Sequence, residues 1–272
     1  MNLLTPTEIS SLLREHGIRP RQSLGQNFLA DPNQVRRIVS LSGVVAGDRV
    51  LEVGPGLGSL TRGLVDAGAR VVAVEADARL AEVCASVVPE AEVVTGDGLR
   101  VDFAALLDDR PWRCVSNLPY NVAVPVLARL LDEVPVVETF LVMLQAEVGE
   151  RLVAGPGDSA RAAISVKVEY HCHSRLVGRV PPTVFIPPPK VDSVLLSLAR
   201  RPPPVAVDPV RLFRVTRAAF AQRRKTIRQS LAVTAGSPAA AADAAQRAGV
   251  DPMARPEDLS LAEFAALAGV LP

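Results

Sequence analysis

A glycine-rich turn directly after an apolar run limits the possible folds of this chain more than any other feature. The run Val50-Leu51-Glu52-Val53 is typical of a buried strand, and the turn Gly54-Pro55-Gly56-Leu57-Gly58 leads from it into a helical stretch. Glycines in such a turn allow a tight bend and let a ligand approach the backbone closely. The pattern predicts a strand, a ligand-binding turn and a helix, in that order.

Further strand-like runs alternate with helical stretches through the first two thirds of the chain. They are Arg70–Glu75, Glu92–Thr95, Arg113–Ser116, Phe140–Leu144, Ile164–Cys172 and Val191–Ala199. This alternation indicates βαβ units. Asp31-Pro32 combines an N-cap with a proline at the first helical position, so a helix should precede the first strand. We expect an α/β fold with a seven-stranded, mostly parallel sheet and helices on both faces.

The remainder of the chain predicts a small all-α domain. Pro202-Pro203-Pro204 cannot continue a helix or a central strand, and Asp208-Pro209 signals a new helix start. No strand-like run follows. We expect a first domain over residues 1–201, a Pro-rich linker over 202–207 and a helical domain over 208–272.

Composition narrows the class of protein. The chain has 272 residues, of which 49% are hydrophobic, and no apolar run approaches the roughly 18 to 20 residues of a membrane span. The N-terminus lacks the pattern of a secretory signal. The three cysteines are too scattered for a disulfide framework or a CxxC site. We therefore expect no membrane association and a cytoplasmic location.

A metal site is not expected. His171 and His173 would share one face of a strand, but no further group of ligands accompanies them.

Charge is distributed unevenly although the net charge is only +1. Between Arg200 and Arg228 the single acid is Asp208, whereas basic residues are frequent. This excess fits a phosphate-binding surface, but a solvated helix face explains it as well.

Two acids extend the cofactor signature of the glycine turn. Glu75 ends the next strand, where a carboxylate can accept hydrogen bonds from ribose hydroxyls. Asp97 follows the third strand and can accept a hydrogen bond from a cofactor adenine, although an aspartate in Gly-Asp-Gly is often an ordinary turn residue. Ser59 replaces a glycine of the dinucleotide fingerprint. These residues alone leave both S-adenosylmethionine and NAD, and hence a dehydrogenase, as possibilities.

The segment Asn117-Leu118-Pro119-Tyr120, directly after the fourth strand, points to methyl transfer. The Asn117 side-chain oxygen and the Leu118 carbonyl can accept the two hydrogens of an adenine amine and aim its nitrogen at a methyl group. Pro119 fixes the backbone and has no competing N–H. Tyr120 offers a face on which the base can stack. A turn that buries an aromatic residue is the competing interpretation.

The order of these motifs resembles the small-subunit rRNA adenine dimethyltransferases of the KsgA type, which share a fold with the macrolide-resistance methyltransferases. The resemblance covers nearly the whole chain. Its segments are Leu24–Leu29, Gly54–Gly58, Glu75, Asp97, Asn117–Asn121, Gln145–Leu152, Pro187–Ser193 and Phe220–Leu231. It implies a Rossmann-like class I methyltransferase domain with S-adenosylmethionine as cofactor.

The resemblance also implies roles for individual residues. Asn27 and Leu29 would contact the cofactor from an N-terminal segment that covers it, and Gly54 would approach its methionine portion. Glu75 would bind the ribose, Asp97 the cofactor adenine, and Asn117 both cofactor and target amine. Phe185 would face Tyr120 across the target base, and Phe28 would help to shape that pocket. The family methylates two adjacent adenines in a hairpin loop near the 3′ end of 16S rRNA, within the assembling 30S subunit, and many members take part in subunit assembly.

Two features favour this branch of the family over the resistance enzymes. One is Leu118, where those enzymes often have isoleucine, and the other is the stretch Gln222–Thr226, in which Arg223, Arg224 and Lys225 would bind RNA. Large-subunit methylation that confers macrolide resistance, and an assembly factor that barely methylates, remain alternatives. Away from the ribosome we expect a monomer.

The same region allows two predictions about helices. Arg214, Arg217, Arg224 and Arg228 recur near helical spacing and would form one phosphate-tracking stripe if the helix is continuous. Thr226 and Gln229 could instead begin a new helix and break the stripe.

Two departures from the family pattern bear on the site. Ala123 and Val124 stand before Pro125 where the family usually has Ser and Thr, so a helix that opens at Pro125 would lack a side-chain cap, a loss of about 1 kcal/mol. Because this cap is missing, we expect a looser loop after Tyr120. Arg161-Ala162-Ala163 replaces a common Tyr-Gly-Arg, so a substrate role for that stretch is in doubt.

Overall fold

The chain packs into two compact units in the computed structural model, which describes residues 3–21, 25–222 and 224–272. Unit 1 consists of residues 1–149 and 175–199, and unit 2 of residues 150–174 and 200–272. The expected division at residues 202–207 lies close to the last of these boundaries. The segment 150–174, which was expected in the first domain, packs with the C-terminal helices instead.

A seven-stranded sheet with the order β4-β3-β2-β5-β6-β9-β7 forms the centre of unit 1. β2 pairs in parallel with β3 and β5, β3 with β4, and β5 with β6, whereas β9 is antiparallel to β6. β1 and β8 form a separate antiparallel pair. The strands are β1 (Phe28–Leu29), β2 (Arg49–Val53), β3 (Arg70–Glu75), β4 (Glu92–Thr95), β5 (Trp112–Asn117), β6 (Val137–Gln145), β7 (Cys172–Val180), β8 (Phe185–Ile186) and β9 (Ser193–Arg200). The mostly parallel α/β sheet is thereby confirmed.

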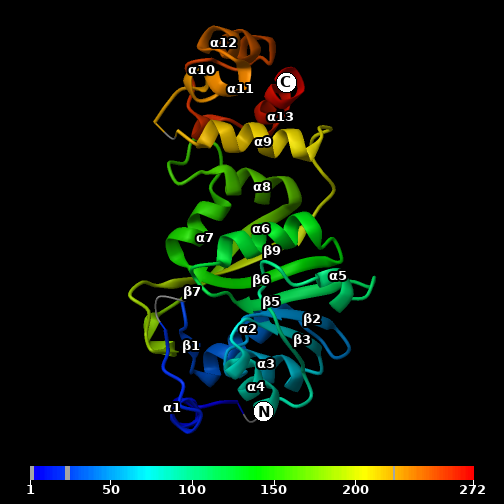
Figure 1. Cartoon of the computed structure of the whole chain (residues 1–272), viewed down its shortest axis with the longest axis vertical. Helices are drawn as coiled ribbons and strands as arrows, with labels where there is room; N and C mark the ends of the chain where they lie inside the picture. Colours follow the sequence, from blue (N-terminus) through cyan, green and yellow to red (C-terminus); the bar gives the residue numbers. More distant parts are fainter. Residues whose placement is uncertain (1–2, 22–24, 223) are drawn as a thin grey trace. The chain divides into compact units, whose positions relative to one another are not determined.

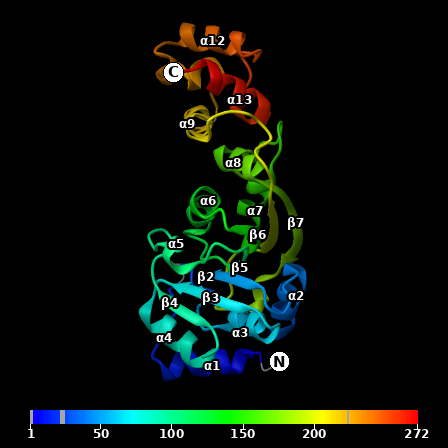
Figure 2. The same ribbon diagram turned by 90° about the vertical axis from the view of Figure 1, so that its right-hand side faces the viewer.

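Helices cover both faces of this sheet (Figures 1 and 2), with α2 and α3 on one side and α6 on the other. The helices up to residue 153 are α1 (Pro6–Glu15), α2 (Pro32–Ser42), α3 (Ser59–Asp66), α4 (Ala78–Val87), α5 (Phe103–Leu106), α6 (Ala123–Glu133) and α7 (Ala146–Val153), and a short 3-10 turn, η2 (Pro182–Val184), precedes β8. The Asp31 carboxylate accepts hydrogen bonds from the backbone N–H groups of Asn33 and Gln34, so the predicted cap of α2 is confirmed.

Alternate residues of the central strands are buried on opposite faces of the sheet, where they pack in the core. Val50, Val71 and Val115 pack against α2 and α3 in one core cluster, and their neighbours in the strands are equally buried on the other face. Because β2, β3, β4 and β5 run in parallel, their carboxyl ends lie along one edge of the sheet. That edge is where open α/β sheets bind ligands.

Unit 2 is helical. Its core is formed by buried residues of α8, α9, α12 and α13, among them Val166, Leu212, Phe213, Ala244 and Phe264. Asp208 accepts a hydrogen bond from the Val210 N–H and caps α9 as predicted. The elements are α8 (Ala163–His171), α9 (Pro209–Phe220), α10 (Ile227–Ser230), α11 (Ala232–Ala235), α12 (Pro238–Arg247), η3 (Pro256–Asp258) and α13 (Leu261–Val270).

The expected strand Ile164–Cys172 is wrong, because these residues form α8 and the strand β7 begins only at Cys172. The apolar residues alternate with polar ones in this segment, which is the strand pattern. The helix tolerates this pattern because its polar side chains have partners inside unit 2. Ser165 donates to the Arg151 carbonyl, Lys167 lies 4.1 Å above the centre of the Phe213 ring, and Glu169 pairs with Arg161.

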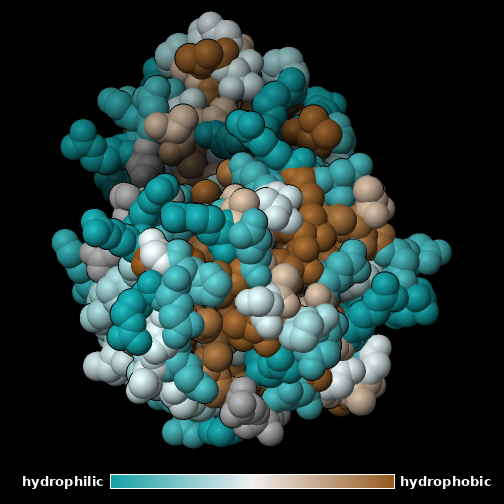
Figure 3. All heavy atoms as spheres, turned by 60° about the horizontal axis from the view of Figure 1, so that its bottom comes forward, coloured by the Kyte–Doolittle hydropathy of each residue, from teal (hydrophilic) through white to brown (hydrophobic). Residues whose placement is uncertain are grey.

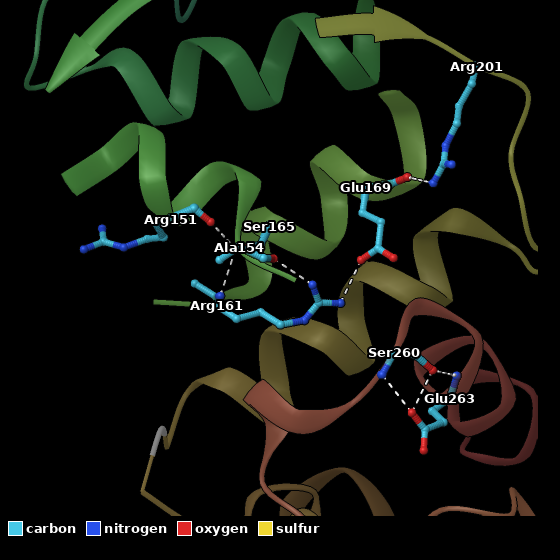
Figure 4. A network of polar contacts seen from close by, with 9 residues as sticks. Arg151, Ala154, Arg161, Ser165, Glu169, Arg201, Ser260 and Glu263 are labelled. Carbon is cyan, nitrogen blue, oxygen red and sulfur yellow. Dashed lines mark hydrogen bonds and ion pairs between the residues drawn. The ribbon is translucent and has the colours of Figure 1, made fainter. Parts of the chain in front are cut away.

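Arg161 ties the segment before α8 to the helix itself (Figure 4). Its guanidinium is fully buried and donates to the Ala154 carbonyl and to Glu169 Oε2, each at 2.8 Å. Arg201 donates to the Glu169 carbonyl. Arg161 therefore has a structural role within this segment, whereas the segment joins unit 2 through Arg201, through Lys167 on the Phe213 ring and through Val166 in the core of unit 2.

The exterior is mainly hydrophilic on the face shown in Figure 3, with hydrophobic atoms visible in a band between polar side chains. Among the described residues, no helix has both the length and the apolar character needed to cross a bilayer.

Candidate active site

A cavity of about 420 Å³ lies at the carboxyl ends of β2, β3, β4 and β5. It is lined by the glycine turn after β2, by the acids that follow β3 and β4, and by the turn after β5. Residues of the segment from Arg21 to Leu29 line it as well. Asn27, Leu29, Gly54, Glu75, Asp97 and Asn117, which were singled out from the sequence as cofactor-binding, all contribute to its wall.

The glycine turn is packed too closely to accept side chains. Gly54 has φ +77°, and a Cβ atom there would lie 2.9 Å from Pro119 Cδ. Gly56 has φ +59°, and its Cβ would lie 3.0 Å from the Phe28 ring. Both conformations favour glycine, and both positions let the turn touch another part of the site. Gly54 and Gly56 also line the cavity.

Glu75 holds the turn from the end of β3. Its carboxylate accepts hydrogen bonds from the Gly56 N–H at 3.0 Å and from the Asp77 N–H at 3.1 Å. Burial raises the pKa of Glu75, while these backbone hydrogen bonds act in the opposite direction. The carboxylate keeps acceptor capacity for ligand hydroxyls, because an ionised carboxylate has about four lone-pair sites.

Asp97 combines both interpretations that the sequence allowed. Its Oδ1 accepts a hydrogen bond from the Leu99 N–H at 2.9 Å, as in an ordinary aspartate turn. The same residue lines the cavity. From α6, Arg129 donates to the carbonyl of the neighbouring Gly98 at 3.1 Å and fixes this turn.

The turn Asn117–Tyr120 is held at every residue. Asn117 Nδ2 donates to the Asn27 carbonyl at 3.3 Å, and the Leu118 N–H donates to the Met143 carbonyl at 3.2 Å. Pro119 packs on Gly54, and its carbonyl accepts a hydrogen bond from the Val122 N–H. Among the described residues none donates to the Leu118 carbonyl or to Asn117 Oδ1. Of this turn Asn117 and Pro119 line the cavity, whereas Leu118, which is 1% exposed, and Tyr120 are not among its lining residues.

Both the backbone and the side-chain hydroxyl of Tyr120 are held by contacts. A Cβ on Gly25 would lie 2.8 Å from the Tyr120 nitrogen, so the N-terminal segment packs directly on its backbone. Its hydroxyl lies 2.5 Å from Ser193 Oγ. Burial raises the pKa of Tyr120, so the phenol stays neutral at ordinary pH.

The two phenylalanines named from the sequence differ in position. Phe28 lines the cavity and packs on Gly56. Phe185 is only 2% exposed and packs with Leu29 and Met143 in the core. Phe185, in the strand β8 that pairs with β1, is not among the residues that line the cavity, and its position across the base from Tyr120 stays a prediction.

Three features of the cavity were not anticipated. Arg21 is the only basic residue among the described residues that line it. Glu52, an acid within an otherwise apolar strand, also lines it, is 1% exposed and accepts a hydrogen bond from Thr61 at 2.6 Å. Burial raises the pKa of Glu52 to about 8, against the effect of this hydrogen bond. Asn27 Oδ1 is buried and has no hydrogen-bond partner.

The helix after the catalytic turn begins earlier than expected. α6 starts at Ala123 rather than at Pro125, and its N-cap residue is Val122. No side-chain hydrogen bond caps it, as expected, but the premise that Val124 stands at the cap was wrong, because Ala123 and Val124 lie inside the helix and the cap residue is Val122.

The basic stretch of unit 2 does not form one continuous stripe. α9 ends at Phe220 and α10 begins at Ile227 after the N-cap Thr226, whose side chain makes no capping hydrogen bond. Arg211 and Arg214 donate to the carbonyls of Leu271 and Pro272, the last residues of the chain.

Arg224 and Lys225 lie between α9 and α10 and are exposed. Arg223 lies outside the described residues. Groups of ligands that could hold a metal ion are absent from the described part of the chain.

Comparison with known proteins agrees with this geometry. Residues 17–271 match the family model for ribosomal RNA adenine dimethylase. A relative from Leifsonia xyli subsp. xyli, "Ribosomal RNA small subunit methyltransferase A", is 50% identical over 278 residues, with 98% of each chain covered. A protein of the same name from Thermobifida fusca is 50% identical, with 98% of this chain and 95% of the relative covered.

Solved structures show the same fold. A dimethyladenosine transferase from Plasmodium falciparum has a TM-score of 0.75 at 22% identity and covers 90% of this chain and 99% of its own. The 23S rRNA methyltransferase ErmE has a TM-score of 0.66 at 26% identity, with the same shares covered. Because the family model spans residues 17–271 and relatives 50% identical cover nearly the whole chain, the chain belongs to the ribosomal RNA adenine dimethylase family and is an S-adenosylmethionine-dependent methyltransferase.

Proposed function

We propose that this protein dimethylates N6 of two adjacent adenosines in a hairpin loop near the 3′ end of 16S rRNA, within the assembling 30S subunit. The relatives that are 50% identical over nearly their whole length carry the name of small-subunit methyltransferases. The ErmE structure, whose name refers to 23S rRNA, is only 26% identical. The difference in identity favours the small subunit as the target.

The observation that carries this proposal is the position of Asn117, which lines the cavity at the start of a turn held in place by its neighbours. Asn117 Oδ1 and the Leu118 carbonyl accept no hydrogen bond from the described residues, whereas the turn around them is fixed by Asn27, Met143 and Gly54. Two acceptors held in place can bind both hydrogens of an adenine amine and leave its nitrogen directed at an electrophile. No strong base is needed for this step.

The cavity fits S-adenosylmethionine, which supplies an electrophilic methyl group when it is bound. Gly54 lines the cavity, where its backbone would contact the methionine portion. Glu75 has acceptors for ribose hydroxyls, and Asp97 for the adenine amine. The buried, unpartnered Asn27 Oδ1 can accept from an ammonium group. These are complementary chemical groups for each part of the cofactor.

Charge within the cavity supports the same orientation of the cofactor. Besides Glu52, which keeps its proton because burial raises its pKa to about 8, three acids line it, Glu75, Asp77 and Asp97, against Arg21 as the single base among the described lining residues. The acids complement a cofactor that carries an ammonium and a sulfonium. Arg21 would pair with its carboxylate, the one anionic group of S-adenosylmethionine.

The target base would stack on Tyr120 after leaving its loop, because an aromatic face stabilises an unstacked base. Arg223, Arg224 and Lys225 would hold the phosphates of the rRNA. A ribosomal substrate implies action in the cytoplasm and a role in the biogenesis of the small subunit, with the protein monomeric away from the particle.

Undermethylated 30S and 50S particles test the substrate. With labelled S-adenosylmethionine we expect label in two adjacent adenosines of 16S rRNA. Label only in 50S particles would instead favour the resistance-type activity, and 30S binding without label would favour an assembly factor.

Substitution of Asn117 by Ala tests the role of the turn. Loss of one positioned acceptor should lower kcat by about 10²- to 10³-fold. The melting temperature should stay close to that of the wild type, because Asn117 is only half-buried. Asn33→Ala, a surface change near the cap of α2, is the control. Dimethylation near the wild-type rate would refute the proposed role of Asn117.

A further inference from the structure

The hydrogen bond between Tyr120 and Ser193 joins two sequence segments that have no assigned connection. Tyr120 belongs to the turn after β5, and Ser193 ends the proline-rich segment Pro187–Ser193 and begins β9. The two oxygen atoms are 2.5 Å apart. Ser193 is fully buried, and its hydroxyl has no other hydrogen-bond partner among the described residues.

The position of Ser193 follows from the sheet. In the antiparallel pairing of β6 with β9, Ser193 lies opposite Gln145, the last residue of β6. The Ala146 N–H donates to the carbonyl of Asp192 at 2.9 Å and so fixes Asp192, the residue before Ser193. Ser193 Oγ is therefore carried by a strand and not by a mobile loop.

The backbone of Tyr120 is held independently of this bond. Gly25 packs on its nitrogen, and Pro119 before it packs on Gly54. These contacts fix the backbone of Tyr120 but not the two torsion angles of its side chain. A hydrogen bond at the far end of the ring removes that freedom. A ring that is already oriented loses less conformational entropy when a base stacks on it.

We propose that Ser193 is a positioning residue for the target base, which holds the Tyr120 ring by its hydroxyl in the orientation that stacks on the adenine. This inference rests on the stacking role proposed for Tyr120. It assigns the end of the proline-rich segment a function that neither the cofactor cavity nor the amine-accepting turn explains.

A spectroscopic experiment tests the bond itself. The chain has only two tyrosines, Tyr120 and Tyr170, so tyrosine labelled with ¹³C at Cζ yields two NMR signals. Tyr170→Phe identifies the signal of Tyr120. Ser193→Ala should shift this signal and leave that of Tyr170 in place. An unchanged Tyr120 signal would show that the ring is not held by Ser193 and would overturn the inference.

A double-mutant cycle tests the function. Ser193→Ala and Tyr120→Phe each remove one hydroxyl, and each should raise the KM for undermethylated 30S particles by about 3- to 10-fold, the effect of one hydrogen bond. The variant with both changes should be no worse than either single variant, because both remove the same bond. For Ser193→Ala the Kd of S-adenosylmethionine and the kcat should stay within about twofold of wild type, since the bond acts on binding of the base.

Two outcomes would contradict the inference. Additive effects of the two changes would mean that the hydroxyls act separately, and an unchanged KM would mean that the bond only satisfies a buried serine. Tyr120→Ala separates this inference from the stacking role on which it rests. Loss of stacking should raise the KM by about 10- to 100-fold. If Tyr120→Ala is harmful and Ser193→Ala is not, only the role of Ser193 fails, whereas a harmless Tyr120→Ala would refute stacking itself.

Discussion

Arg21 shows how one side chain can complement a ligand of mixed charge. It is the only basic residue among the described residues that line a cavity with four acids. Its backbone is held by the Gln26 side chain, which accepts from the Arg21 N–H at 2.8 Å. The guanidinium is exposed and has no acidic partner among the described residues. A carboxylate in the cavity would be its natural partner.

Arg21→Ala should therefore weaken only ligands that carry a carboxylate. We expect the Kd of S-adenosylhomocysteine to rise about 10- to 100-fold, the effect of one charge-assisted hydrogen bond. The Kd of 5′-methylthioadenosine, which lacks the amino-acid portion, should stay within about twofold. Isothermal titration calorimetry measures both, and Arg19→Ala is the control in the same segment. Equal weakening of the two ligands would contradict the pairing.

Glu52 should make stability depend on pH. Its pKa in the folded protein is about 8, above the ordinary value of 4.5, because the carboxyl is fully buried. The folded state thus keeps a proton that the unfolded state releases, so its contribution is present below about pH 4.5 and is lost as the pH rises to about 8.

Glu52→Gln keeps the shape of the side chain and removes the titration. Urea denaturation between pH 5 and pH 8.5 should show a steeper decline of the unfolding free energy for the wild type than for the variant. Glu75, whose pKa is also raised, is present in both proteins, and its charge adds to the raised pKa of Glu52 in the wild type. Parallel curves for the two proteins would show that Glu52 does not titrate in this range.

At the scale of elements, α8 shows the limit of sequence periodicity. Its residues alternate between apolar and polar types as in a strand, yet Ser165, Val166, Lys167 and Val168 are all buried in the helix. Periodicity predicts an element only if one of its faces is exposed to water. In α8 the buried polar groups are satisfied by residues distant in the chain, which no local pattern can reveal.

Arg161→Ala should destabilise unit 2. It removes two charge-assisted hydrogen bonds and leaves Glu169 and the Ala154 carbonyl without their partner. We expect a loss of about 1.5–3 kcal/mol, with the low end favoured because the Glu169 side chain is 35% exposed. Chemical denaturation measures this loss. Arg247→Ala, which breaks the exposed pair with Asp243, should cost at most about 0.5 kcal/mol. Equal losses for both variants would contradict a structural role for Arg161.

At the scale of the whole molecule, the cavity and the bases proposed to bind RNA belong to different units. The cavity and the amine-accepting turn are formed entirely by residues of unit 1. Arg224 and Lys225 belong to unit 2, where Arg211 and Arg214 are already occupied by the carbonyls of the last two residues. The exposed bases between α9 and α10 are therefore better candidates for phosphate contacts than the predicted stripe.

Replacing Arg224 and Lys225 together by Ala should weaken binding to 30S particles more at low salt than at high salt. Each lost phosphate contact should lower, by about 1, the slope of the logarithm of the binding constant against the logarithm of the salt concentration. Filter binding across a series of salt concentrations measures this slope. The control replaces Arg247 and Arg255, two bases of the same unit that pair with acids. An unchanged affinity at low salt would exclude the stretch as an RNA contact.

The sequence by itself determined the local features of this protein. Asp31 and Asp208 cap their helices, Gly54 adopts a left-handed conformation, and the parallel strands bring Glu75 and Asn117 to one edge of the sheet. These features depend on residues close in the chain or on the order of strands and helices. For that reason the fold class and most of the cavity could be predicted.

Only the tertiary structure decided which distant groups meet. It buried Phe185 in the core, placed Ser193 against Tyr120, raised the pKa of Glu52 and assigned residues 150–174 to unit 2. Each of these results depends on contacts between residues far apart in the chain, and burial and hydrogen bonding there outweigh local pattern. The glycine turn that first limited the fold is itself an example, because its contact with Pro119 exists only in the folded protein.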